Sequence, residues 1–312
     1  MTDLRGKRII ITGATGFIGR HVTKELLSEG ALVTAVVRSG SPGRKYLPEG
    51  EGLTVLESSL SEIGGKLPPA DVFLHFAWAG VNREEIDSPV VQKKNIEDSL
   101  QCLLAARDAG CTLFMDAGSR VEYGITEDGV MEESMECRPV NEYGKAKLLF
   151  YEKAAALCRT FGMTFYHMRF FSVYGTDDHP WSIISTLTRE LPKGGTVSLS
   201  ACRHRWNFME VGDAARAVTE LIRHSDAFPG VVQPVNIAGK DTRVLRDFVT
   251  EIDDLTAHRG TLEFGTFVQA KEGALSICPE LHELEKLTEG GFSERETFAS
   301  GIKKILKNGE SE

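Results

Sequence analysis

The chain of 312 residues is poor in cysteine and has no two cysteines close together in the sequence. Zinc sites and dithiol redox sites are typically marked by closely spaced cysteines, so this spacing argues against both, and we expect no metal site. The thiols are therefore expected to be reduced, as in a cytoplasmic protein. The six positions are Cys102, Cys111, Cys137, Cys158, Cys202 and Cys278.

An excess of positive charge and long apolar runs are also absent. The formal net charge is −9, which argues against a nucleic-acid partner, because such binding depends on basic surface that neutralises phosphates. No apolar run reaches the length needed to span a membrane, so no membrane partner is expected. An apolar strand is predicted at 8–12. Because this strand lies so close to the first residue, we expect no signal peptide before it.

The first two thirds of the chain alternate short apolar runs with amphipathic helical stretches. This alternation is typical of an α/β protein with a doubly wound parallel sheet that carries helices on both faces. The predicted strands are 8–12, 32–37, 72–76, 112–116 and 164–170. The predicted helices are 16–29, 90–109 and 143–161.

The alternation becomes irregular after residue 174, where glycine and proline are frequent. The change predicts a first domain over 1–170 and a smaller α/β lobe over 171–312. A strand and helix predicted at 206–223, and a short strand at 234–238, indicate that the chain returns to the first domain at about 206–238.

The first predicted strand leads directly into a glycine-rich turn that opens a helix. Glycines in this setting let the backbone approach a pyrophosphate closely, and the helix N-terminus favours its negative charge. Glycines alone are a weak signal, but the order of strand, turn and helix favours a dinucleotide cofactor. The residues expected to bind it here are Gly13, Thr15, Gly16, Phe17, Ile18 and Gly19.

Arg38 and Ser39 follow the second predicted strand. A chain that selects NAD usually has an acidic residue at this point, where it binds the adenine ribose. A guanidinium instead suits the 2′-phosphate of NADP. The sequence therefore favours NADP(H), with NAD(H) as the alternative, because a solvated surface arginine would also explain Arg38.

A tyrosine and a lysine four positions apart open the third predicted helix, so Tyr143 and Lys147 share one helical face. A nearby ammonium favours the phenolate, and Tyr143 would then exchange a proton with a carbinol while hydride passes to or from a nicotinamide. Such pairs also occur by chance on surface helices. Ser119 adds weight, because it follows a predicted strand at the edge where open α/β sheets bind ligands.

These segments together resemble the extended short-chain dehydrogenases/reductases over nearly the whole chain. The resemblance is carried by the glycine turn, Ser119, the Tyr143 and Lys147 pair, Asn95, and the segments 75–77 and 169–175. It implies a Rossmann sheet, a catalytic triad of Ser119, Tyr143 and Lys147, and a contact of Lys147 with the nicotinamide ribose. The nearest similarity is to enzymes of nucleotide-linked sugars, in which the second lobe holds the nucleotide diphosphate.

The resemblance also implies roles for residues around the two ligands. Ala77 and Phe170 match positions that flank the cofactor. The segment 203–208 resembles the diphosphate-binding strand, but Trp206 stands at its usual arginine position, so Arg203 or Arg205 would supply the charge. The residues expected at the substrate are Asn95, Arg120, Ser172, Arg203, Arg205 and Asn207.

The type of reaction is narrowed by the two residues after Ser119. The 4,6-dehydratases have an Asp-Glu pair there, which supplies an extra acid and base, whereas this chain has Arg120 and Val121. Dehydration is therefore disfavoured, which leaves a 4-ketoreductase that consumes NADPH or a 4-epimerase that keeps NAD bound. Arg38 favours the reductase.

Other classes of protein stay open at this point. One is a non-catalytic dinucleotide-binding regulator, against which the intact triad argues. Another is a reductase of carbonyl compounds without a nucleotide. The resemblance also implies a homodimer joined through the helices at 90–109 and 143–161, with outward apolar residues that include Leu103 or Leu104 and Leu148 or Leu149.

Overall fold

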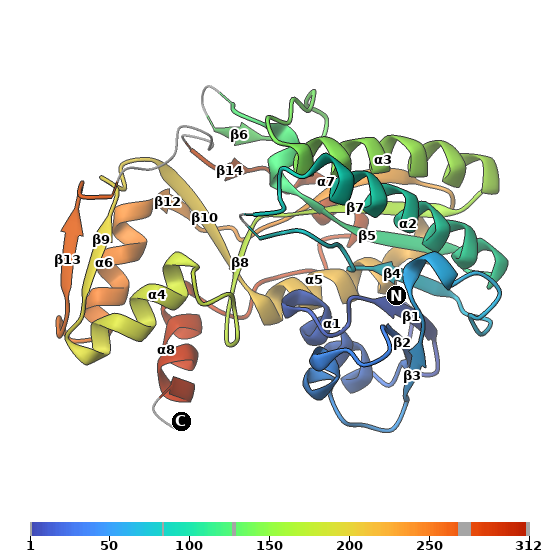
Figure 1. Ribbon diagram of the computed structural model, residues 1–312, viewed down its shortest axis with the longest axis horizontal. Coiled ribbons are helices and arrows are strands. Elements are labelled where there is room, and N and C mark those ends of the chain that lie inside the picture. The colour runs from blue at the N-terminus through green and yellow to red at the C-terminus, as the bar shows by residue number, and fades with distance from the viewer. Residues whose placement is uncertain (1, 83, 127–128, 268–275, 310–312) are drawn as a thin grey trace.

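A computed structural model describes residues 2–82, 84–126, 129–267 and 276–309. Its centre is a seven-stranded sheet in the order β3-β2-β1-β4-β5-β7-β11 (Figure 1). All neighbouring strands in it are parallel, so their carboxyl ends share one edge. The strands are β1 Arg8–Thr12, β2 Leu32–Val37, β3 Leu53–Glu57, β4 Val72–His75, β5 Leu113–Ser119, β7 Thr164–Phe170 and β11 Val232–Ile237.

Helices cover both faces of this sheet (Figure 1). Helices α1 (Phe17–Ser28) and α5 (Val211–His224) share one apolar core with Ile9 and Ile11 of β1. Helices α2 (Pro89–Asp108) and α3 (Glu142–Phe161) share a second core with Ile10. Alternate residues of a strand point to opposite faces, so one short apolar strand serves both cores. The predicted α/β fold with a doubly wound parallel sheet is confirmed.

Two features of the sheet differ from the sequence prediction. The strand β3 was not predicted, because it lies at the sheet edge and its side chains are half-buried or exposed. The strand β5 extends three residues beyond the predicted end at 116, because its ladder with β7 continues to Ser119 opposite Phe170. Ser119 is therefore held by strand pairing.

A smaller group of elements lies beside the sheet (Figure 1). Strands β8 (Ser172–Tyr174), β10 (Arg205–Glu210) and β12 (Thr242–Val244) form a three-stranded sheet. Its apolar core contains a packed aromatic cluster of Phe208, Phe248 and Phe298. The remaining strands are β6 Val130–Met131, β9 Thr196–Leu199, β13 Thr261–Phe264 and β14 Cys278–Pro279. The remaining helices are α4 Ile183–Glu190, α6 Leu245–Leu255, α7 His282–Leu287 and α8 Phe298–Gly309.

Short 3₁₀ turns connect several of these elements. They are η1 Pro42–Tyr46, η2 Leu60–Glu62, η3 Arg120–Tyr123, η4 Leu191–Lys193 and η5 Ser225–Ala227. The turn η3 follows β5 without a break, and Ser119 is its N-cap. The backbone N–H of Ser119 donates to Glu122 Oε1 at 2.6 Å, and the N–H of Val121 donates to Ser119 Oγ at 3.4 Å. This reciprocal capping fixes the position of the serine.

Four charged side chains form a buried charge cluster between β5, η3 and β7: Asp116, Glu122, His167 and Arg169. His167 bridges the two carboxylates, with Nδ1 at 2.7 Å from Asp116 Oδ1 and Nε2 at 2.8 Å from Glu122 Oε2. Arg169 Nε donates to the same Glu122 oxygen at 3.1 Å. A Cβ on Gly118 would lie 2.5 Å from His167 Nε2, so glycine leaves the space that the cluster occupies.

The charges in this cluster stabilise one another. Burial by itself would raise the pKa of Glu122, but the charges and hydrogen bonds of His167 and Arg169 outweigh it and lower that pKa to about 2. Burial would lower the pKa of His167, but Asp116 and Glu122 outweigh it and raise that pKa to about 9. At neutral pH both partners are therefore charged.

We predict that Glu122→Gln lowers the free energy of unfolding by roughly 3–5 kcal/mol, because it leaves buried cations without their carboxylate. Urea unfolding at pH 7 measures this. The matched control is Glu136→Gln, which removes an exposed carboxylate paired with Arg138 and should leave the urea midpoint nearly unchanged. Equal midpoints for the two variants would show that the cluster does not stabilise the fold.

The same contacts make stability depend on pH in a defined direction. The raised pKa of His167 means that its stabilisation is complete below pH 6.5 and is lost as the pH rises towards 9. The lowered pKa of Glu122 means that its stabilisation is present above pH 4.5 and is lost as the pH falls towards 2. In Glu122→Gln, the decrease in the free energy of unfolding above pH 6.5 should be smaller than in the wild type.

Candidate active site

The predicted cofactor turn lies where β1 passes into α1. Gly13 has a φ of 72°, and a Cβ there would lie 2.6 Å from the backbone nitrogen of Ala77. A Cβ on Gly19 would collide with the carbonyl oxygen of Gly13. These two glycines allow the turn to pack against the end of β4 and against the first turn of the helix.

The N-terminus of α1 fits the phosphates of a dinucleotide. Its N-cap is Gly16, which has no side chain to occupy the first backbone N–H groups, and its first turn has no acidic residue. Free N–H groups and the positive end of the helix dipole both favour an anion. Thr15 and Phe17 are half-buried beside this turn, and Ile18 packs on the core.

Arg38 and Ser39 are exposed at the same edge of the sheet as the glycine turn, because Thr12 of β1 pairs with Val36 of β2. Within the described parts of the chain, the Arg38 side chain makes no hydrogen bond and no ion pair. A guanidinium in this position is available to a group on the adenine ribose.

The three catalytic candidates come together at the carboxyl ends of β4 and β5. Ser119 ends β5, and Tyr143 lies in the first turn of α3, which Asn141 caps by accepting the N–H of Gly144 at 2.8 Å. Burial raises the pKa of Tyr143, and a side-chain hydrogen bond with Ser119 opposes that rise. The serine and tyrosine hydroxyls thus face each other.

Lys147 lies one helical turn further along α3 and is buried. Its Nζ donates to the carbonyl oxygen of Ala117 at 2.6 Å and lies 5.7 Å from the centre of the Tyr143 ring. Burial lowers its pKa to about 8, against the opposing effect of Asp116 and Glu122. At neutral pH most of Lys147 is therefore an ammonium, which favours the phenolate form of Tyr143.

Trp78 completes this site and was missed in the sequence. Its ring centre is 3.5 Å from Lys147 Nζ, and its ring packs edge-on against Tyr143 at 6.2 Å. The indole N–H donates to Gln92 Oε1 at 2.9 Å, and Gln92 Nε2 donates to the carbonyl oxygens of Gly80 and Ile86. A single tryptophan after a strand belongs to no recognisable motif. Its contacts with Lys147 and Gln92 become visible only when α2 and α3 are placed beside β4.

Two of the expected substrate residues hold the protein's own loops. The Asn95 amide accepts the N–H of Ala79 at 3.0 Å and donates to the carbonyl oxygen of the same residue at 2.9 Å. The Asn207 amide makes the corresponding pair of bonds with Gly239, at 3.0 and 2.6 Å. Both amide groups are therefore engaged within the protein's own chain, and their contact with a substrate stays a prediction.

The other expected residues lie on several different elements. Ala77 donates its N–H to Thr12 Oγ1 at 3.4 Å, and Phe170 packs against Phe76 at 5.9 Å, so both lie at the cofactor edge. Ser172 is half-buried at the start of β8.

The three arginines proposed for the substrate differ in their surroundings. Arg203 and Arg205 are exposed, and Arg205 donates to the carbonyl oxygen of Thr242 at 3.1 Å. Arg120 is half-buried and lies over the ring of Trp206, with 5.2 Å between its Cζ and the ring centre.

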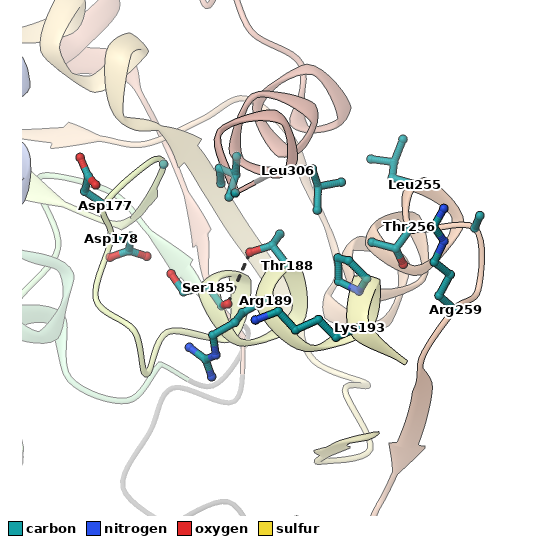
Figure 2. Close-up of a pocket in the computed structure, with 15 residues that line it drawn as sticks. Asp177, Asp178, Ser185, Thr188, Arg189, Lys193, Leu255, Thr256, Arg259 and Leu306 are labelled. Carbon is teal, nitrogen blue, oxygen red and sulfur yellow. Dashed lines mark hydrogen bonds between the residues drawn. The ribbon is translucent and has the colours of Figure 1, made fainter. Parts of the chain in front are cut away.

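A cavity of about 540 Å³ lies elsewhere, between α4, α6 and α8 (Figure 2). Its lining includes Asp177, Asp178, Thr188, Lys193 and Arg259, and none of the catalytic candidates. It therefore belongs to a different part of the molecule from the Ser119 and Tyr143 site.

Two possible features are absent from the residues that the structure describes. Within 2–82, 84–126, 129–267 and 276–309, no group of three or more His, Cys, Asp or Glu side chains is arranged to hold a metal ion. No helix in those ranges is both long and apolar enough to cross a membrane.

Comparison with known proteins identifies relatives of this chain. Residues 9–238 match the model of the family described as NAD dependent epimerase/dehydratase family. The uncharacterized UDP-glucose epimerase YtcB of Bacillus subtilis (strain 168) is 24% identical over 82% of this chain and 84% of its own length. The dTDP-6-deoxy-L-talose 4-dehydrogenase (NAD(+)) of Aggregatibacter actinomycetemcomitans is 27% identical over 69% of this chain and 79% of its own. UDP-glucose 4-epimerases of several bacteria match over only about half of their length.

Solved structures agree with these matches. The structure of MoeE5 in complex with UDP-glucuronic acid and NAD is 25% identical and superposes with a TM-score of 0.82 over 97% of this chain and 99% of that one. With the family model covering most of the chain, the protein belongs to the NAD dependent epimerase/dehydratase family, within the extended short-chain dehydrogenases/reductases, and is an enzyme of that type.

Proposed function

We propose that this protein is a 4-epimerase of a nucleotide-linked sugar, with its dinucleotide cofactor kept bound through the reaction. The observation that carries the proposal is the contact of the Ser119 and Tyr143 hydroxyls beside the buried Lys147 ammonium. The similarity to UDP-glucose epimerases supports the reaction, and it favours epimerisation over the ketoreduction that Arg38 suggested in the sequence.

In the proposed mechanism, Tyr143 takes the proton of the C4 hydroxyl as hydride leaves that carbon. A bound nicotinamide supplies the hydride acceptor and donor. Ser119 donates a hydrogen bond to the same oxygen, and the Lys147 ammonium keeps the phenolate low in energy. Tyr143 would then return the proton to the C4 oxygen as hydride comes back to the opposite face of C4, which would give the epimer and restore the starting enzyme.

The ligands are assigned to the two parts of the chain as a proposal. Residues 1–170, with the returning segment at about 206–238, would bind the dinucleotide through Gly13, Gly16, Gly19, Ala77 and Phe170. The rest of 171–312 would bind the sugar nucleotide. We also propose a cytoplasmic location, supported by the wide spacing of the cysteines in the sequence.

A second candidate function is a 4-ketoreductase or 4-dehydrogenase of a nucleotide-linked deoxysugar. It is supported by the similarity to a dTDP-6-deoxy-L-talose 4-dehydrogenase and by the exposed Arg38. The same Ser119, Tyr143 and Lys147 would serve it, because only the fate of the hydride differs. The distinction is therefore one of cofactor use: an epimerase regenerates its cofactor in each turnover and a reductase consumes it.

We predict that the purified protein interconverts UDP-glucose and UDP-galactose without net change in nicotinamide absorbance, as followed by NMR of the products. Tyr143→Phe should lower turnover by roughly 10²–10⁴-fold, the range of general acid–base catalysis, and leave cofactor affinity almost unchanged. The control is Tyr166→Phe, because the Tyr166 hydroxyl is buried in β7 and has no hydrogen-bond partner in the described chain.

The outcomes separate the candidates. Full activity of Tyr143→Phe would exclude the mechanism. Stoichiometric oxidation of NADPH by UDP-, dTDP-, CDP- or GDP-linked 4-keto-6-deoxysugars, with no epimerisation, would favour the reductase. Ser119→Ala should reduce mainly turnover, whereas Lys147→Ala should reduce both turnover and cofactor affinity.

We predict that Arg38→Ala weakens NADP(H) far more than NAD(H), because only NADP(H) places a phosphate where a guanidinium can bind it. The loss should correspond to the ~1.5–3 kcal/mol of a charged hydrogen bond, measured by calorimetric titration of both cofactors. Arg44→Ala is the control, because Arg44 is exposed nearby but already paired with Glu57. Equal losses for the two cofactors in Arg38→Ala would contradict the proposed role.

We propose that two subunits pair through α2 and α3, which lie side by side on one face of the sheet (Figure 1). Val90 and Leu149 are exposed there, at 79% and 41%. Leu103 is buried in the protein's own core, so of Leu103 and Leu104 only the half-buried Leu104 stays a candidate for an outward position. Leu149→Glu should give a monomer by light scattering at micromolar concentration. Leu32→Glu, at an exposed site on β2, should not, and a monomeric wild type would refute the pairing.

A further inference from the structure

Arg120 differs from His167 and Arg169, the two cations of the buried charge cluster, because no ion pair with a carboxylate accompanies it in the described residues. His167 and Arg169 bond to Asp116 and Glu122, as described above. The residue Arg120 is half-buried at the start of η3, yet no Asp or Glu in the described ranges lies within ion-pair distance of it. Burial lowers its pKa to about 10, so it is still protonated at neutral pH.

Two buried nitrogen atoms, one on Trp206 and one on its neighbour His204, lack hydrogen-bond partners among the described residues. The Arg120 guanidinium lies over the Trp206 ring, and the Trp206 ring packs edge-on against His204 with 5.3 Å between centres. Both Trp206 Nε1 and His204 Nε2 are buried without a hydrogen-bond partner among the described residues. A buried polar atom without a partner costs free energy, so a cluster of them beside an unpaired cation indicates a site for an anionic ligand.

The place of this cluster connects it to the catalytic site. Arg120 directly follows Ser119, whose hydroxyl meets Tyr143. Trp206 belongs to β10, which pairs with β8 just after the end of β7. The guanidinium therefore lies between the reacting hydroxyls and the smaller sheet, where a substrate that reaches from one to the other must pass.

We propose that Arg120, supported by Trp206 and His204, binds an anionic group of the substrate, either the diphosphate or a carboxylate on the sugar. This inference rests on the proposed function, because it assumes a sugar nucleotide at Tyr143. It replaces the expectation that Arg203 or Arg205 supplies this charge, since both are exposed. The charged hydrogen bonds of a guanidinium to phosphate or carboxylate oxygens are strong and directional.

The test compares the binding of four probes to the wild type and to Arg120→Met by calorimetry, with NAD present. The probes are UDP, UDP-glucose, UDP-glucuronate and inorganic pyrophosphate. Arg120→Met should weaken the anion that the site binds by roughly 10- to 100-fold, which corresponds to a lost charged hydrogen bond. Arg120→Lys should lie between the two, because it keeps the charge and loses the planar fork.

The pattern across the probes identifies the anionic group. If all four probes weaken alike, Arg120 binds the diphosphate. If only UDP-glucuronate weakens, it binds a carboxylate on the sugar. The control is Arg246→Met, which also removes an arginine lying over an aromatic ring, 3.9 Å from the centre of Phe264, and should change none of the affinities. Unchanged NAD affinity in Arg120→Met shows that the fold is intact.

The remaining outcomes separate a failure of this inference from a failure of the proposed function. Unchanged affinity of Arg120→Met for probes that the wild type binds would overturn the inference and leave the proposed function standing. Binding of pyrophosphate that depends on Arg120, with no binding of any UDP ligand, would support the anion site and count against the UDP-sugar assignment. A wild type that binds none of the four would overturn the inference.

Discussion

Burial of charge between β5, η3 and β7 is the constraint on which the candidate active site depends. Two carboxylates and two cations occupy a region that an apolar core would fill at lower cost, because each charge loses its hydration there. The arrangement is stable only if every member keeps its partner. Glu122 is shared between His167, Arg169 and the backbone of Ser119, so the position of the serine is tied to the register of two strands.

The consequences of this constraint extend to the proton relay. Asp116 and Glu122 both raise the pKa of Lys147 against the effect of its burial, while Trp78 covers the ammonium from the other side. A buried lysine without nearby carboxylates would be largely neutral and would not stabilise a phenolate. The same cluster thus holds the serine in place and keeps the lysine charged, which explains why these charges lie so close to the edge of the sheet.

Much of this fold follows from local patterns in the sequence. Short strands such as β1, β2 and β7 are recognised at their true limits, because most of their residues are apolar or β-branched and almost all of them are buried. The triad is also recognised locally, since Tyr143 and Lys147 are one helical turn apart. The charge cluster is not, because Glu122 and His167 are 45 positions apart and meet only through the pairing of β5 with β7. The bonds of Asn95 show the same limit, because no local pattern indicates that its amide holds Ala79, 16 positions away.

The place of β11 at the outer edge of the large sheet has a consequence for how the protein is made. The sheet is assembled from the beginning of the chain, yet its last strand ends at Ile237 of 312 residues, after the chain has formed β8, β9 and β10 elsewhere. On the ribosome, β7 must therefore wait with one side unpaired while more than sixty residues emerge, which include strands of the smaller sheet and α5, since Phe170 and Ile237 are partners in the finished ladder. Domains that fold from the N-terminus during synthesis expose such an edge for the time that translation takes. The residues between β7 and β11 therefore delay completion of the large sheet during synthesis.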